Sequence, residues 1–349
     1  MNRRWIAKPK GFTLIEFLVA SALAIIVISA AGGTYFMTRK VNDATQRKLE
    51  IQQNLRNAAS MITRDARNAG TFGCFNMALD GKPPVLPSGL TSIGLEIDKT
   101  KDDGFGVRQL SKNQVTILTK LGSFTAESDA LIFVYGRGAA GINEEITNAR
   151  PNKLSINDAS NDPDLNLTLS EKGYLVLSSC TEARLAQVTG VGSGFKTVNV
   201  SIDPNNALSS IITDSQNSRG EITVSRFYAS MYVLGKLSAT DSPALLRFDL
   251  NGQGKWQGPQ LLAEGVSGMS ISYGYITDCT NLTATDASGM NQEKYTFDNK
   301  LSSKTLPAIV RLHLTYNTSA DKANQSETDY FINASVRGGN TCGTVLPVL

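Results

Sequence analysis

The residues best suited to chemistry begin with a carboxylate inside an apolar run. Glu16 is the single charge within residues 12–36, FTLIEFLVASALAIIVISAAGGTYF. An isolated carboxylate within a membrane helix costs roughly 2.5–3.5 kcal/mol. Glu16 therefore predicts a compensating partner, unless the carboxylate lies near the membrane interface and reaches water or takes up a proton.

Cysteine is the next reactive residue type, and the four cysteines lie far apart at Cys74, Cys180, Cys279 and Cys342. No CxxC pair occurs among them, which excludes a zinc site of the usual spacing. An even number predicts disulfides, provided that the chain reaches an oxidising compartment. We predict the pairs Cys74 with Cys180 and Cys279 with Cys342, because each would close the ends of a β region; free buried thiols are the alternative.

Two glycine-containing segments imitate ligand-binding motifs. Residues 136–141, GRGAAG, match GxGxxG after a predicted strand, but no amphipathic helix follows, so we expect a surface loop and no nucleotide. Residues 249–254, DLNGQG, imitate the start of a calcium loop. Gln253 and Gln260 occupy positions that need stronger ligands, which favours a hairpin turn at Asn251 and Gly252.

The single histidine, His313, lies in a strand-like run, where a structural role is expected. No cluster of residues suggests a nucleophile with its base. The sequence therefore predicts no catalytic residue, no metal site and no cofactor.

The apolar run is the element that must position Glu16. Its 25 residues exceed the roughly 20 that cross a bilayer and the roughly 7–15 of a removable signal peptide core. The bases Arg3, Arg4, Lys8 and Lys10 precede it, so the leader should stay cytoplasmic and the remainder should be exported. Without these bases the chain is nearly neutral, and no basic run with interleaved aromatic residues predicts a nucleic-acid partner.

The segment around Glu16 carries a specific resemblance. Residues 10–16, KGFTLIE, look like the processing site of type IV pilins. The resemblance implies that a membrane prepilin peptidase cuts after Gly11 and methylates the new N-terminal Phe12. It also implies that Glu16, the fifth residue after the cut, neutralises the ammonium of a neighbouring subunit during assembly.

Beyond the span, apolar and small residues continue at helical spacing, which predicts one helix through residue 69, about 85 Å long at 1.5 Å per residue. The predicted buried stripe consists of Val41, Ala44, Ile51, Leu55, Ala58, Ile62, Ala66 and Ala69. The predicted solvated side consists of Arg47, Glu50, Gln52, Arg56, Arg64 and Asp65. The helix should end at residues 70–73, GTFG, because glycine suits a left-handed C-cap.

A second resemblance covers the end of this helix. Residues 64–74, RDARNAGTFGC, are similar to the segment that closes the long helix in minor pilins of the PilW kind, although Thr71 departs from the aromatic residue usual there. Looser similarities follow at 262–266, 271–274 and 309–314.

From residue 75 onward the pattern changes to short β-rich runs bounded by turn residues. The predicted strands are 114–119, 130–135, 174–179, 184–189, 196–202, 222–234, 245–249, 268–276, 308–316 and 330–336. So many strands with short connections favour antiparallel sheet. Residues 141–170 and 203–221 are polar and are expected to form loops.

These observations predict an α+β fold, with a long pilin-like N-terminal helix packed on a β-rich, mainly antiparallel head that has room for two subdomains. The predicted domains are a leader (1–11), a transmembrane part of the helix (12–36), an amphipathic part (37–70) and the head (71–349).

The resemblance implies a non-enzymatic minor pilin that is held in the bacterial inner membrane, with its head in the periplasm, and then enters an extracellular pilus. Its partners would be prepilin peptidase, other minor and major pilins, the inner-membrane assembly platform and membrane lipid. The pilus would serve twitching, adhesion or DNA uptake. A minor pseudopilin of a type II secretion system and a pilus-tip adhesin are the alternatives.

Overall fold

A computed structural model describes most of the helix and the sheets of the head. The described residues are 11, 13–76, 106–119, 124–142, 153–156, 162–179, 183–192, 197–201, 222–238, 240–278, 294–302, 306–317, 327–337 and 339. All structural statements below refer to these residues.

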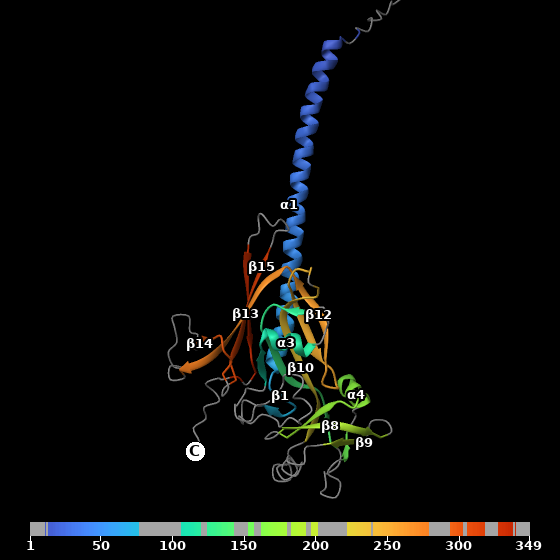
Figure 1. Cartoon of the computed structure of the whole chain (residues 1–349), viewed down its shortest axis with the longest axis vertical. Helices are drawn as coiled ribbons and strands as arrows, with labels where there is room; N and C mark the ends of the chain where they lie inside the picture. The colour runs from blue at the N-terminus through green and yellow to red at the C-terminus, as the bar shows by residue number, and fades with distance from the viewer. Residues whose placement is uncertain are drawn as a thin grey trace, which may run out of the picture.

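The helix α1 (Leu14–Asn68) is 55 residues long and extends well beyond the head (Figure 1). No proline interrupts it, and Thr13 caps its first turn. It ends before Gly70, whose φ of 77° lies in the left-handed region that glycine adopts without steric cost. The predicted continuous helix is therefore confirmed, with its end two residues before the expected Gly70.

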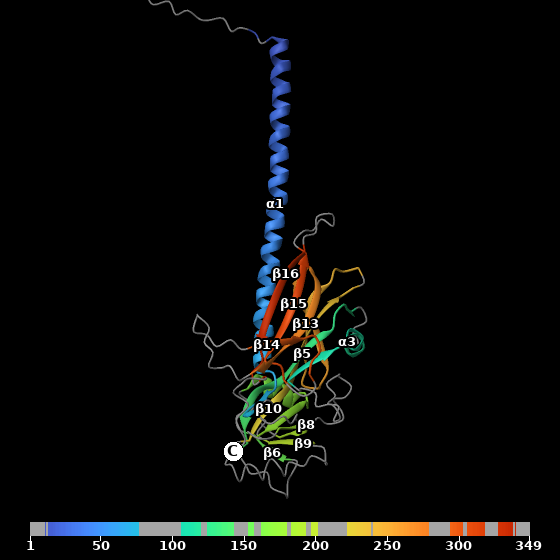
Figure 2. The same cartoon turned by 90° about the vertical axis from the view of Figure 1, so that its left-hand side faces the viewer.

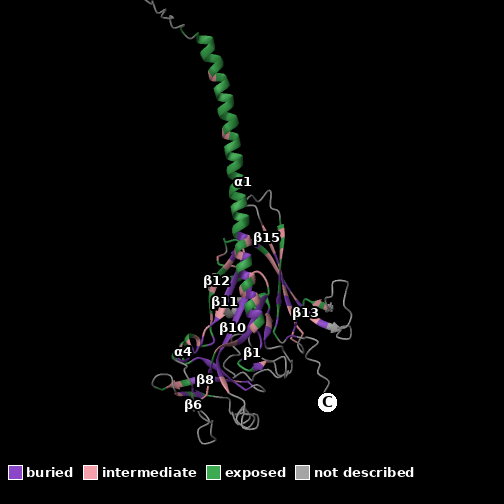
Figure 3. Ribbon diagram, turned by 180° about the vertical axis from the view of Figure 1, so that it is seen from behind, coloured by how far each residue is buried: buried purple, intermediate pink, exposed green. Residues whose placement is uncertain are grey.

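The second half of α1 packs on the head, and the first half does not. Figure 3 shows this change from exposed to buried along the helix. The buried stripe contains Ile51, Leu55, Ala58, Ile62, Ala66 and Ala69, as the spacing predicted. Val41 and Ala44 of the predicted stripe are exposed, because they lie on the part of the helix that precedes the head.

The larger sheet of the head is antiparallel in every pairing. Along its main path the strand order is β12-β11-β10-β7-β8-β9-β6, and β10 also pairs with β5 and β4, while β5 pairs with β3. The strands of this sheet are β3 (Val107–Leu110), β4 (Thr125–Ala126), β5 (Ala130–Gly141), β6 (Lys153–Ser155), β7 (Tyr174–Ser178), β8 (Ala183–Val191), β9 (Thr197–Ser201), β10 (Thr223–Lys236), β11 (Ala244–Leu250) and β12 (Trp256–Glu264).

The smaller sheet has the strand order β14-β13-β15-β16 and is also antiparallel. Its strands are β13 (Val266–Asp278), β14 (Lys294–Asp298), β15 (Ile309–Asn317) and β16 (Glu327–Ser335). Strand β16 lies at the edge beside α1, as Figure 2 shows. Alternating burial along β15, with Val310, Leu312 and Leu314 buried, is typical of a sheet with one face on the core.

Three smaller features complete the head: the helices α3 (Lys112–Thr119) and α4 (Pro163–Ser170), and a hairpin of β1 (Thr71–Phe72) with β2 (Phe75–Asn76) that follows α1 directly.

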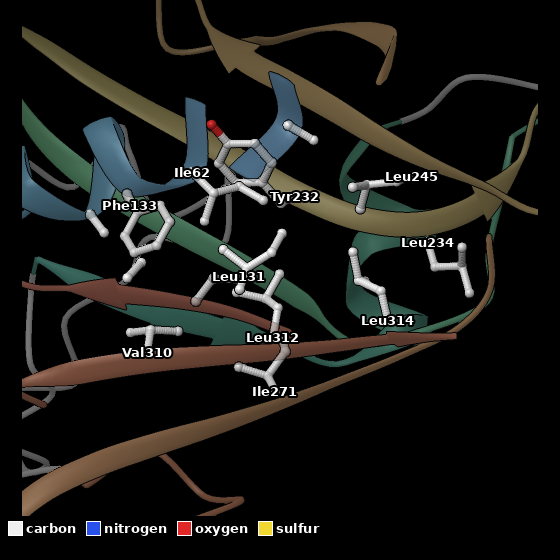
Figure 4. Packing of buried hydrophobic residues seen from close by; sticks show 14 of the residues in the cluster. Ile62, Leu131, Phe133, Tyr232, Leu234, Leu245, Ile271, Val310, Leu312 and Leu314 are labelled. Atoms are coloured by element: carbon white, nitrogen blue, oxygen red, sulfur yellow. The ribbon is translucent and has the colours of Figure 1, made fainter. Parts of the chain in front are cut away.

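The main core lies where α1 and the two sheets meet. Figure 4 shows Ile62 of α1, Leu131 and Tyr232 of the larger sheet, and Leu312 of the smaller sheet in one cluster. Burial of apolar side chains contributes about 25 cal/mol per Å² of surface removed from water, so this shared core holds the helix and both sheets together. The opposite face of the larger sheet carries a second cluster that includes Phe227 and Phe248.

The antiparallel α+β fold is confirmed, but three segments of the head have a different secondary structure from the one predicted. Residues 114–119 belong to α3, where the side chain of Gln114 accepts a hydrogen bond from the N–H of Ser111 at 3.0 Å. This polar start signal outweighs the β-branched residues that follow it.

The other two errors concern segments predicted as loops. Residues 136–141 continue β5 and pair with β10, because their small residues fit closely against the neighbouring strand. Residues 141–170 contain β6 and α4; the side chain of Asp162 caps α4 and Pro163 begins it. The predicted loop at 203–221 lies outside the described residues.

Candidate functional site

The first candidate site is the start of α1, which the sequence predicts to be processed. Gly11 is exposed, Phe12 lies outside the described residues, and Thr13 has the extended backbone of an N-cap residue, with φ of −78° and ψ of 147°. The chain therefore enters the helix two residues after the predicted cut.

Glu16 forms a capping box with Thr13 of its own chain. The backbone N–H and the hydroxyl of Thr13 donate to Oε2 of Glu16 at 3.0 and 2.9 Å, and the N–H of Glu16 donates to Oγ1 of Thr13 at 3.4 Å. These bonds satisfy orphan donors of the first helical turn. Glu16 thus has an intrachain partner even without a second subunit, which the sequence did not anticipate.

The helix around Glu16 presents an apolar surface that no described residue of the chain covers. Its most apolar 18-residue window has a mean hydropathy of 2.5 and no buried residue. The exposed fractions of Leu14, Phe17 and Ile28 are 79%, 68% and 70%. Among the described residues this is the one helix long and apolar enough to cross a membrane. Apolar surface of this extent needs lipid or another protein as its environment.

The second candidate site is a buried ionic cluster where α1 joins the head. Asp65 of α1 is completely buried. Tyr135 of β5 donates to its Oδ1 at 3.0 Å, Tyr232 of β10 donates to its Oδ2 at 2.6 Å, and Nη2 of Arg247 in β11 lies 3.2 Å from the same Oδ2. The carboxylate therefore binds three strands of the larger sheet to the helix.

The cluster continues from Arg247 into the sheet. Nη2 of Arg247 donates to the hydroxyl of Tyr228 at 2.8 Å, and that hydroxyl donates to Oδ1 of Asp249 at 2.6 Å. Nε of Arg247 lies 2.9 Å from the same carboxylate oxygen. Arg247 thus lies between Asp65 and Asp249, and its charge is compensated on both sides.

A third carboxylate extends the cluster to α4. The guanidinium of Arg137 stacks 4.6 Å from the ring centroid of Tyr228, and its Nη2 lies 3.3 Å from Asp164. Arg226 lies 3.5 Å from Asp164 and donates to the carbonyl of Leu250 at 3.1 Å. Alternating charges therefore run from α1 through β5, β10 and β11 to α4.

Burial fixes the protonation of the tyrosines in this cluster. Burial, reinforced by the negative charge of Asp65, raises the pKa of Tyr135 and of Tyr232 well above the usual range. Both hydroxyls therefore remain donors to Asp65 at any pH at which the chain is folded in cells. The side chains of Asp65, Tyr232 and Arg247 are buried and bonded to one another, which suits a structural joint between helix and sheet.

The sequence missed this cluster and placed Asp65 on the solvated side of the helix. That prediction is wrong, because Asp65 follows Ile62 by three residues and precedes Ala69 by four, which puts it on the buried face. The spacing was the available signal. Tyr135, Tyr232 and Arg247 are distant in sequence, and no local pattern connects them.

The remaining predicted residues are placed as follows. Cys74 lies in the β1–β2 turn and is disulfide-bonded, whereas Cys180, Cys279 and Cys342 lie outside the described residues, so the two predicted pairs stay predictions.

Asp249 binds Tyr228 and Arg247, and residues 251–255 connect the β11–β12 hairpin, which confirms a turn there.

His313 lies on the outer face of the smaller sheet. It stacks on Phe331 with ring centroids 4.5 Å apart, and its Nε2 lies 2.8 Å from Oδ1 of Asp329. No group of three or more His, Cys, Asp or Glu residues that could hold a metal occurs in the described part of the chain.

Comparison with known proteins gives one match at the N-terminus. Residues 6–32 match the family described as the prokaryotic N-terminal methylation motif. Neither the curated proteins nor the solved structures give a match.

A methylation motif, a long helix with an apolar exposed half and an antiparallel β head are together the features of a prepilin-like protein. This motif is the prepilin-type N-terminal signal. The motif implies processing by prepilin peptidase and assembly with pilins.

Proposed function

We propose that the chain is a minor pilin of the PilW kind in a type IV pilus, where it takes part in initiating assembly or in the tip complex. The exposed apolar half of α1 carries this proposal, because a surface of this kind can move from lipid to the packed helices of a filament without entering water. The head beyond the helix is large, which by analogy with the family favours a minor subunit.

The start of the helix supports a specific role for the predicted site residues. Cleavage between Gly11 and Phe12 would leave an ammonium one residue before the Thr13 cap. Glu16 is held at the same helix end, where its second carboxylate oxygen can accept a charge-assisted bond from the ammonium of a neighbouring subunit. Assembly would thus add a partner to Glu16 while the bonds to Thr13 persist.

The proposal also assigns the segments of the chain. Residues 1–11 form the leader, 12–36 span the inner membrane, and the rest of the helix carries the head, 71–349, in the periplasm and then in the pilus. The predicted disulfides, Cys74 with Cys180 and Cys279 with Cys342, would form in the periplasm. Membrane lipid and the assembly platform are the partners before assembly.

The buried cluster at Asp65 would transmit force between helix and head. A subunit pulled from the membrane by its helix must not separate from its head, and Asp65 is bonded to β5, β10 and β11 near the end of α1. Breaking such a buried pair leaves an uncompensated charge, at a cost of roughly 3–5 kcal/mol.

Mass spectrometry of the membrane-extracted mature chain tests the proposal. We expect loss of residues 1–11 and the added mass of one methyl group on Phe12, and both should disappear in a Gly11→Val variant. An intact N-terminus, or a cut beyond residue 30, would contradict the pilin function. Deletion of the gene should then reduce surface pili; a secretion defect with normal piliation would instead assign the chain to a type II secretion pseudopilus.

A further inference from the structure

The outer face of the smaller sheet carries a stacked pair of rings. His313 of β15 and Phe331 of β16 are directly opposite each other in the strand register, and their rings stack with centroids 4.5 Å apart and an interplanar angle of 8°. The stack covers one face of each ring. Phe331 nevertheless remains 55% exposed, so no described residue covers its second face, which points away from His313. Figure 2 shows β13, β15 and β16 side by side on this side of the head.

Two polar side chains flank the open ring of Phe331. Asp329 precedes it by two residues and Asn333 follows it by two, and all three residues are exposed. Because side chains two residues apart in a strand share one face, each polar group lies about 6.8 Å along the strand from the ring. We define the ring site as Asp329, Phe331 and Asn333.

Strand β15 holds both polar groups of the ring site in place. Nε2 of His313 lies 2.8 Å from Oδ1 of Asp329, and Nε of Arg311 donates to Oδ1 of Asn333 at 2.8 Å. Arg311 is itself stacked on Phe297, 3.8 Å from the ring centroid. Since a guanidinium can only donate, it must face the amide oxygen of Asn333, which turns Nδ2 of that amide away from β15. The two side chains are therefore oriented before any ligand arrives.

Each polar group keeps unused bonding capacity. Within the described part of the chain, Oδ2 of Asp329 has no hydrogen-bond donor and Nδ2 of Asn333 has no acceptor. An open aromatic face thus lies between an acceptor on one side and a donor on the other. A pyranose sugar has the matching chemistry, because one face of its ring consists of C–H groups that pack on the electron-rich face of an aromatic ring, while its hydroxyls both donate and accept.

We propose that the ring site binds a neutral pyranose sugar, with the sugar ring stacked on Phe331. Asp329 accepts from one hydroxyl of the sugar and Asn333 donates to another, while His313 and Arg311 are positioning residues. The site goes beyond the proposed pilin function and does not depend on it. If the head is exported as proposed, the site would attach it to a surface that carries glycans.

An anionic ligand fits the ring site less well. Arg311 is the one cation among its described neighbours with permanent charge, and it is already bonded to Asn333 and stacked on Phe297. The carboxylate of Asp329, 60% exposed, would repel a phosphate or a second carboxylate. The near balance of charge favours a neutral ligand.

A protein partner also fits less well, because protein interfaces have a contiguous apolar centre. In the described part of the head, the large apolar side chains that are exposed are Leu167, Leu237, Leu261 and Phe331. They lie on α4, after β10, on β12 and on β16, so the ring of Phe331 is isolated on its sheet face. One flat ring between two hydrogen-bonding groups suits a single sugar better than a protein surface.

Saturation-transfer NMR of the full-length chain, solubilised in a detergent without a sugar head group, tests the proposal. The probes are the methyl pyranosides of glucose, galactose and mannose. We expect saturation of the ring C–H protons of at least one of them. Mannitol carries the same hydroxyls on an open chain without a ring and should give no signal above background.

Substitutions at Phe331 separate ring stacking from a structural role. Phe331→Leu keeps an apolar side chain but removes the flat face, so the signal should fall roughly tenfold, whereas Phe331→Trp should retain it. Because Phe331 is more than half exposed, both variants should unfold at a temperature close to that of the parent. Leu261→Ala changes an exposed apolar residue of the larger sheet and should leave the signal unchanged.

Substitutions of the polar groups test the two hydrogen bonds. Asp329→Ala and Asn333→Ala should each lower the signal by roughly threefold to tenfold, as expected for the loss of one hydrogen bond. Three results would overturn the proposal: no saturation of any of the three pyranosides, an equal signal from mannitol, or a Phe331→Leu variant that binds like the parent. Leader cleavage is measured separately, so an intact leader would refute the pilin function and leave the sugar site standing.

Discussion

Two carboxylates in one helix have opposite environments, and each is compensated differently. Glu16 lies in the exposed apolar half of α1 and is bonded to Thr13 of its own first turn. Asp65 is completely buried and is bonded to Tyr135, Tyr232 and Arg247. Under the proposed function Glu16 is the carboxylate that a neighbouring subunit would bind, whereas Asp65 is occupied by contacts within the fold.

Removal of the Asp65 charge should destabilise the head strongly. In Asp65→Asn, Arg247 loses one of its two compensating carboxylates in a buried setting, so the free energy of unfolding should fall by roughly 3–5 kcal/mol. Urea unfolding of the detergent-solubilised chain measures this change. Arg64→Ala removes a neighbouring charge that is 65% exposed and should change stability by less than about 1 kcal/mol. Equal losses in both variants would refute the role of the cluster.

The buried tyrosines predict a loss of stability in alkali. Burial raises the folded-state pKa of Tyr135 and Tyr232, so above about pH 10 the unfolded chain releases protons that the folded chain retains. The contribution of the two tyrosines to the free energy of unfolding is therefore complete below about pH 10 and is lost as the pH rises further.

A Tyr135→Phe/Tyr232→Phe variant should be less stable at neutral pH but should lose stability less steeply in alkali. Chemical unfolding at a series of pH values compares the two slopes, and parallel slopes would contradict the assignment.

At the scale of elements, the junction between α1 and the larger sheet depends on close approach at glycine. Gly73 in the β1–β2 turn has φ of 63°, and a Cβ there would overlap Oγ1 of Thr223 and lie 2.8 Å from Oγ of Ser178. The turn that follows the helix is thus pressed against β7 and β10.

Gly73→Ala should destabilise the head by roughly 1–3 kcal/mol, because both the backbone angle and the contact with Thr223 become unfavourable. The double variant Gly73→Ala/Thr223→Ala should recover part of this loss, because the overlap with Oγ1 of Thr223 is removed while the backbone strain of about 1–2 kcal/mol and the close approach to Oγ of Ser178 remain. Thermal unfolding of the single and double variants measures the coupling. Full additivity of the two changes would show that no steric contact exists.

The buried stripe of α1 should account for much of the helix–head association. Leu55 is completely buried in the core, so Leu55→Ala should lower the free energy of unfolding by about 2–5 kcal/mol. Gln53→Ala, two residues away on the exposed side of the helix, should remain within about 0.5 kcal/mol of the parent. Denaturant unfolding of the pair tests which face of the helix packs on the head.

At the scale of the whole molecule, one helix belongs to two environments. Its first half is not covered by any residue that the structure describes, and its second half shares a core with both sheets. The head is therefore rigidly attached to an element that requires lipid or other helices, which is the mechanical arrangement that a filament subunit needs.

A charge at the centre of the apolar half should prevent stable membrane residence. Ile25→Asp places a second carboxylate in the middle of the proposed span at a cost of roughly 2.5–3.5 kcal/mol. The variant should shift from the membrane pellet to the soluble fraction after carbonate extraction, or be degraded. Val41→Asp, which is exposed beyond the span, should stay in the pellet; identical behaviour of both variants would contradict the assigned span.

The sequence by itself determined the features that depend on local order. The apolar run, the KGFTLIE segment, the helical stripe at Ile51, Leu55 and Ile62, and the alternation along the predicted strands each depend on residues close together in the chain. The long helix, the antiparallel α+β class and the prepilin-type motif follow from them. The errors at α3 and α4 arise where the polar residues that start a helix outweigh the β-branched or polar residues around them.

Only the tertiary structure decided what surrounds each charge. Asp65 and Arg247 are separated by most of the head in sequence, and they meet because β10 and β11 pair antiparallel beneath α1. The same folding left Arg56 and Arg67 in solvent, although they belong to the same helix as Asp65. A charge is buried or exposed according to which elements pack over it, and that packing depends on contacts between residues distant in the chain, for which a single sequence contains no local signal.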